Sequence, residues 1–150
     1  MSCGSSPQNY GPSAILSVLN SDYKDILQHL RRHDVKFLLV GAYAMGAHGY
    51  PRATGDFDIW VEPTPSNSHR VYEALQTFGA PLAQLQPETL AQPGLIFQIG
   101  VPPCRIDILT QIDGIDFPSA YAARQDIELD GVRIPLLSKD DLIKNKESTG

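Results

Sequence analysis

The feature that most constrains this chain is the stretch at residues 56–61, DFDIWV, in which aspartates and large apolar side chains alternate. This period of two predicts a β-strand with Asp56, Asp58 and Trp60 on one face. Aspartate is depleted from strands, so two on one face need a reason. At ~3.4 Å per residue they lie about 7 Å apart, which lets both carboxylates converge on a small metal cluster. The alternative is an edge strand whose polar face meets water.

A second apolar stretch, RIDIL at residues 105–109, carries another aspartate, Asp107, inside a predicted strand. If this strand neighbours the first, three carboxylates point into one site. Because three such groups repel one another, the cluster implies bound cations. Oxygen ligands at this density suit Mg²⁺ or Mn²⁺, and no Cys/His set has zinc spacing.

The third signal is a glycine at a strand-to-helix junction. The apolar run at residues 37–40 predicts a buried strand, and Gly41 with Ala42 opens a short helix. Glycine permits close backbone approach, and a helix N-terminus offers free N–H groups to a phosphate.

The remaining pattern predicts a mixed α+β fold. Residues 1–12 are rich in Ser, Gly, Pro and Asn and are expected to form a flexible tail, with one domain over residues 13–150. Helical periodicity follows Ser21, a helix capped by Asn67 or Ser68 precedes Gly79, and Asp130-Gly131 signals a β-hairpin. We therefore expect a mixed, largely antiparallel sheet with helices packed on it.

Composition narrows the class further. A net charge of -5 weighs against a general DNA-binding protein, and no apolar run is long enough to cross a membrane. The N-terminus has no secretory signal, and Cys3 and Cys104 make no disulfide framework, so Cys104 is expected to be a packing residue. A cytoplasmic setting is the simplest interpretation.

Together, these residues resemble the DNA polymerase beta-like nucleotidyltransferase superfamily. That family has an apolar strand, a Gly-Ser or Gly-Gly pair, about nine to thirteen residues, Asp-x-Asp or Asp-x-Glu, and a later Asp. Here Gly41-Ala42 is followed by thirteen residues, by Asp56-Phe57-Asp58 and later by Asp107. The wider string from Gly41 to Ile59 is similar to small bacterial members close to AbiEii-type and minimal nucleotidyltransferases of toxin–antitoxin and phage-defence systems.

The resemblance implies a polymerase beta palm-like fold and transfer of a nucleoside monophosphate from an NTP to an acceptor hydroxyl. Asp56, Asp58 and Asp107 would hold two Mg²⁺ (or Mn²⁺) ions, and Asp107 would also accept the acceptor's proton. Gly41 and Ala42 would bind phosphates through backbone N–H groups.

Four further residues complete the predicted site. Arg52 and Lys146 are candidates for phosphate binding, against the alternative that both are ordinary surface cations. His48 and Thr54 are expected to support the loop before Asp56. Tyr43 and Trp60 are aromatic residues that could stack on a base, although core packing is the commoner role.

Two departures from the family pattern favour a second hypothesis. Ala42 replaces a residue that often carries a hydroxyl, and the sequence stops at Gly150, where relatives continue with a basic helix. The alternative function is therefore a weak or inactive nucleotidyltransferase fold that acts as an antitoxin or interaction module with a partner protein. The NTP and the acceptor (a protein, a tRNA or a small molecule) stay open.

Overall fold

The computed structural model describes residues 21–49, 56–101 and 104–149. The helices are α2 (Ser21–Arg32), α3 (Gly41–Ala47), α4 (Pro65–Phe78), the 3₁₀ helix η1 (Pro87–Ala91), α5 (Phe117–Ala122) and α6 (Lys139–Thr149). The strands are β1 (Phe37–Val40), β2 (Asp56–Val61), β3 (Ile96–Ile99), β4 (Arg105–Leu109), β5 (Gln125–Leu129) and β6 (Val132–Leu136). The region over residues 1–12 for which we expect a tail lies outside the described residues.

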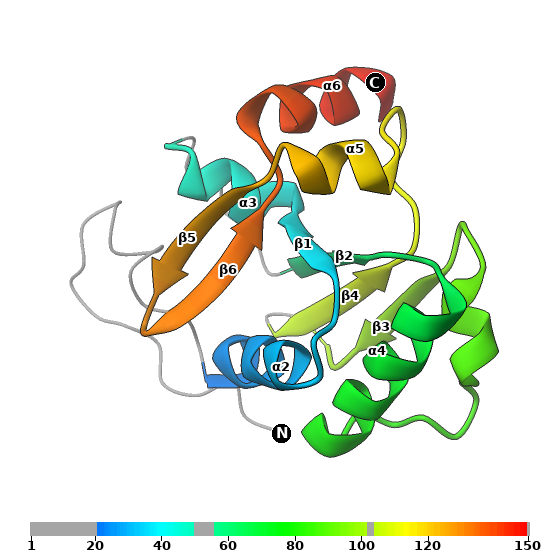
Figure 1. Cartoon of the computed structure of the whole chain (residues 1–150). Coiled ribbons are helices and arrows are strands. Elements are labelled where there is room, and N and C mark those ends of the chain that lie inside the picture. The colour runs from blue at the N-terminus through cyan, green and yellow to red at the C-terminus, as the bar shows by residue number, and fades with distance from the viewer. Residues whose placement is uncertain (1–20, 50–55, 102–103, 150) are drawn as a thin grey trace.

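One mixed sheet organises these elements (Figure 1). Its strand order is β3-β4-β2-β1-β6-β5. The pairs β1–β2, β3–β4 and β5–β6 are antiparallel, whereas β2–β4 and β1–β6 are parallel. The prediction of a mixed, largely antiparallel sheet with helices packed on it is confirmed.

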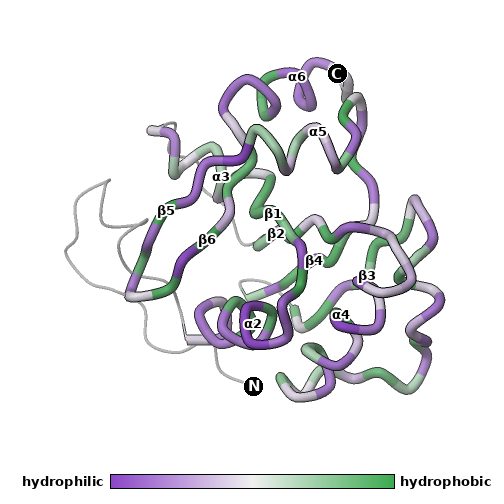
Figure 2. The backbone as a smooth tube through the Cα atoms, in the orientation of Figure 1, coloured by the Kyte–Doolittle hydropathy of each residue, from purple (hydrophilic) through white to green (hydrophobic). Residues whose placement is uncertain are grey.

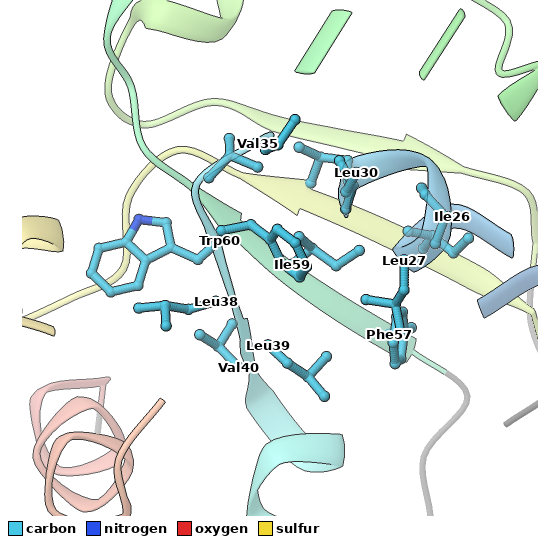
Figure 3. Packing of buried hydrophobic residues seen from close by; sticks show 14 of the residues in the cluster. Ile26, Leu27, Leu30, Val35, Leu38, Leu39, Val40, Phe57, Ile59 and Trp60 are labelled. Atoms are coloured by element: carbon cyan, nitrogen blue, oxygen red, sulfur yellow. The ribbon is translucent and has the colours of Figure 1, made fainter. Parts of the chain in front are cut away.

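The two faces of the sheet bury different side chains. Phe57 and Ile59 of β2 face α2, where Tyr23 stacks on Phe57 with 4.2 Å between ring centroids. Trp60 points to the opposite side, together with Leu38 and Val40 of β1 (Figure 3). Figure 2 shows the apolar colour concentrated along β1 at the centre of the molecule, while α6 is largely hydrophilic. The strict alternation of β2 therefore serves two separate packing layers.

Trp60 is covered by a helix that periodicity does not reveal. Phe117 of α5 meets the Trp60 ring edge-on at 5.0 Å between centroids. Helix α5 has only six residues, too few to show a helical repeat, and its start is set by Asp116, whose side chain accepts a hydrogen bond from the Ser119 N–H.

The start of α4 differs from the expectation. Thr64, not Asn67 or Ser68, caps this helix by accepting a hydrogen bond from the Asn67 N–H. The Asn67 side chain is instead buried and ties α4 to the chain before β1, because its Oδ1 accepts from the Lys36 N–H and its Nδ2 donates to the Lys36 carbonyl. A cap signal shared by several polar residues cannot be resolved without knowing which side chain tertiary contacts require.

The predicted hairpin between β5 and β6 is confirmed, and both of its central residues, Asp130 and Gly131, have positive φ. Among the described residues, no helix is long and apolar enough to cross a membrane. Cys104 is buried, as expected of a packing residue, but it is also disulfide-bonded, which corrects the expectation that the cysteines form no disulfide. The cytoplasmic setting stays a prediction.

Candidate active site

Two of the three predicted catalytic aspartates lie side by side on adjacent strands. Asp58 of β2 is paired in register with Asp107 of β4. The two strands are parallel, so both side chains point away from the same face of the sheet. Neighbouring strands lie about 4.8 Å apart. Because β2 lies between β4 and β1 in the sheet, the alternative of a water-facing edge strand is wrong.

The remaining predicted aspartate, Asp56, begins the same strand as Asp58 and is in register with Arg105. Its side chain lies outside the described part of the structure, which holds no group of three or more acidic, histidine or cysteine side chains placed for a metal ion. The described portion of the site is thus the pair Asp58–Asp107. Two carboxylates on one face supply the hard oxygen ligands that Mg²⁺ and Mn²⁺ prefer, so the donor set fits these ions.

Gly41 closes the site from the neighbouring strand. Val40, the last residue of β1, is in register with Asp58, and the next residue, Gly41, has a φ of +75°. A Cβ added at Gly41 would overlap the Asp58 carboxylate and would lie 3.1 Å from its Cγ. The glycine is therefore needed both for its backbone conformation and for the space that Asp58 occupies.

Arg105 contacts the Asp107 carboxylate directly. The Arg105 Nε lies 3.2 Å from Asp107 Oδ1, and Nη2 donates to Oδ2 at 3.4 Å. The Asp107 side chain is 10% exposed and that of Arg105 is 29% exposed. The guanidinium thus contacts both oxygens of a largely buried carboxylate, and it offsets the repulsion that Asp107 and Asp58 would otherwise exert on each other.

Arg105 and Gln98 are site residues that the sequence reasoning missed. Arg105 could have been predicted from the sequence, because it precedes Asp107 by two residues and so lies on the same face of the strand. Gln98 of β3 is in register with Asp107 and is exposed, which continues the row from Asp58 to the sheet edge. No sequence pattern marks it, since the register of two separate strands places it there.

The structure ties His48 to the rest of the fold. The His48 Nε2 lies 2.9 Å from the Leu137 carbonyl oxygen, so the Nε2–H tautomer donates a hydrogen bond from the end of α3 to the segment between β6 and α6. Helix α6, which carries the exposed Lys146, also contacts α3. Arg52 and Thr54 lie outside the described residues.

The two aromatic candidates belong to the core. Trp60 is 2% exposed and packs on Phe117. Tyr43 packs edge-on against both Tyr23 and Phe57, and burial raises the pKa of its hydroxyl. Trp60 is thus a core residue, and Tyr43 is partly buried against the core.

Comparison with known proteins identifies the fold. No family model and no curated protein sequence matches the chain. Among solved structures, a putative nucleotidyltransferase from Thermotoga maritima superposes with a TM-score of 0.63 over 85% of this chain and 82% of its own, at 12% sequence identity. A structural similarity of this extent at 12% sequence identity shows that the two proteins share a backbone fold. The chain therefore has the fold of that nucleotidyltransferase.

Proposed function

We propose that this chain is a metal-dependent nucleotidyltransferase that transfers a nucleoside monophosphate from an NTP to an acceptor hydroxyl. The observation that carries the proposal is the in-register placement of Asp58 and Asp107 on the same face of two adjacent interior strands. The fold shared with the Thermotoga maritima protein supports the reaction class. Membership of the AbiEii-like bacterial branch is part of the proposal.

In this reaction the acceptor oxygen attacks the α-phosphorus, the bond between the α-phosphorus and the bridging oxygen breaks, and pyrophosphate leaves. Asp56, Asp58 and Asp107 would hold two divalent ions, which would neutralise the phosphates and activate the acceptor oxygen. Asp107 would also accept the proton of the acceptor hydroxyl, as the resemblance implies. The protein's contribution is mainly to position charged groups, as phosphoryl transfer requires.

The start of α3 is the proposed phosphate contact. No side chain caps this helix, whose first residues are Gly41 and Ala42. Backbone N–H groups there would contact the β- and γ-phosphates, with Arg52 and Lys146 as further cations. Because the Asp58 carboxylate lies against Gly41, a phosphate at this point needs a cation between the two anions. The phosphate and metal proposals therefore depend on each other.

Binding of Mg²⁺–NTP tests the proposal without knowledge of the acceptor. Each of the four NTPs is added with Mg²⁺, and the melting temperature is measured. A ligand at a hundred times its Kd stabilises the folded state by about 2.7 kcal/mol, which raises the melting temperature by several degrees. We expect this shift for at least one NTP, and we expect Asp58→Asn to abolish it.

Asp126→Asn is the control, because it removes the same carboxylate charge from the edge strand β5, at the other end of the sheet from Asp58 and Asp107. The control should keep the full shift. If Asp58→Asn binds Mg²⁺–NTP as tightly as the wild type, the metal assignment is wrong. If Mg²⁺–NTP binds as expected, incubation of the protein and a cell extract with an NTP labelled at the α-phosphate would identify the class of acceptor that becomes labelled.

One observation favours the second candidate, an antitoxin or interaction module. Arg105 already neutralises Asp107 in the fold, so the sheet does not require a metal ion to tolerate this carboxylate. A stoichiometric protein partner in a pull-down, together with no shift for any NTP, would support this function and contradict the enzyme.

A further inference from the structure

The chain contains two strands that begin with the same local ion pair. Arg105 and Asp107 of β4 lie 3.2 Å apart between Nε and Oδ1, and Arg124, just before β5, lies 3.3 Å from Asp126 by the same atoms. Arginine and aspartate two residues apart share a strand face, which explains both contacts. The two pairs therefore share the Nε–Oδ1 contact, but only Arg105 also donates to the second carboxylate oxygen, and their surroundings differ.

The surroundings separate the two pairs sharply. Asp126 is 44% exposed on the outermost strand, where an ion pair has little effect on stability. Asp107 is 10% exposed on an interior strand and in register with Asp58, and Arg105 is in register with Asp56. Arg105 thus contacts one member of the in-register pair Asp58–Asp107, where its positive charge offsets the repulsion between the two carboxylates.

Arg105 contacts both Asp107 oxygens, and these are the atoms that a divalent cation would bind. Nη2 donates a hydrogen bond to Oδ2, and Nε forms an ion-pair contact with Oδ1. A divalent cation at Asp107 would therefore compete with the guanidinium for the negative charge of this carboxylate. The Arg105 side chain is 29% exposed, so the described part of the fold does not enclose it completely.

We propose that Arg105 is a positioning residue that holds Asp107 through this ion pair and competes with a divalent cation for the carboxylate. The inference rests on the proposed function and deepens it, because it assigns to Arg105 a role in setting the metal affinity of the same site. A guanidinium displaced from Asp107 becomes available to an anion, and the incoming triphosphate is the anion that the proposed reaction supplies. Metal binding and phosphate binding are thereby coupled through one side chain.

The role of Arg105 is tested by whether its removal tightens or weakens the binding of Mn²⁺. Mn²⁺ binding is measured by electron paramagnetic resonance of the free ion, without nucleotide, for the wild type, Arg105→Gln, Arg105→Lys and Arg124→Gln. Removal of a competing cation should tighten Mn²⁺ binding by Arg105→Gln about two- to tenfold. Arg105→Lys should fall between it and the wild type, because an ammonium cannot make the two-point contact. Arg124→Gln removes the same charge from a distant strand and should leave the Kd unchanged.

A purely structural role predicts the opposite sign, since a loosened Asp107 binds metal less well. Unchanged or weaker Mn²⁺ binding by a folded Arg105→Gln protein overturns the inference and leaves the proposed function standing. If Arg105→Gln fails to fold, the Arg105→Lys protein decides in the same way. Absence of Mn²⁺ binding by the wild type and every variant overturns both the inference and the metal-dependent function.

Discussion

The Asp58 carboxylate lies directly against the Cα of Gly41, so that a single methyl group on Gly41 would occupy the same space. The two residues are seventeen positions apart in the sequence and meet because β1 and β2 pair antiparallel with Val40 opposite Asp58. The Asp58 carboxylate therefore requires a glycine at this position, independently of the phosphate contact that we propose for it.

Substitution of Gly41 by alanine should disturb both stability and the site. The positive φ of +75° costs an alanine about 1–2 kcal/mol, and the overlap with Asp58 adds ~1–3 kcal/mol. Gly49, at the other end of α3, has a φ of +95° with nothing within 4 Å of an added Cβ. Gly49→Ala therefore isolates the backbone cost. Urea unfolding should show the larger loss for Gly41→Ala, and its Mg²⁺–NTP shift should disappear; equal losses would contradict the overlap.

His48 is expected to stabilise the fold without contacting the substrate. Loss of its hydrogen bond to the Leu137 carbonyl should cost about 1 kcal/mol in His48→Ala. Gln can place an N–H near the same position and should restore part of the stability. His33→Ala is the control, because His33 lies 2.9 Å from a carbonyl within its own helical turn, that of His29. A changed Kd for Mg²⁺–NTP in a folded His48→Gln protein would show that His48 does more than hold α3.

Gln98 tests whether the site extends to the sheet edge. A lysine at this position places a positive charge beside Asp107, which should weaken Mn²⁺ binding by about 1 kcal/mol, or severalfold. Gln125→Lys makes the same change at an exposed glutamine on the opposite edge strand, β5. Mn²⁺ titrations of the two proteins give the comparison. Identical affinities would place the metal site away from β3.

Asp116 gives a pH-dependent prediction for the helix that covers Trp60. The hydrogen bond from the Ser119 N–H lowers the pKa of the Asp116 carboxyl in the folded state. The cap therefore stabilises the fold above the carboxyl's ordinary pKa of 3.8, and this contribution is lost as the pH falls through the lowered folded value. Asp116→Ala should lower the melting temperature at neutral pH, and the difference from the wild type should shrink below pH 4. A difference that is constant with pH would contradict the cap.

The sequence determined the elements that local chemistry controls. Alternation in residues 56–61 predicted a strand with two aspartates on one face, and Asp130-Gly131 predicted a hairpin, because both signals arise from neighbouring residues and backbone geometry. The third aspartate, Asp107, was also found from its strand pattern. The sequence alone does not show that the strands of Asp58 and Asp107 are adjacent.

Only the tertiary structure decided which strands pair and in which register. The parallel β2–β4 pairing, which joins segments about fifty residues apart, places Asp107 beside Asp58 and shows that β2 is interior. The same pairing turned Arg105 into part of the site, although Arg124-Gln125-Asp126 carries a similar pair with no such setting. Register between distant strands is fixed by the burial of whole faces, here Phe57 and Ile59 against α2 and Trp60 against α5, and no local pattern encodes it.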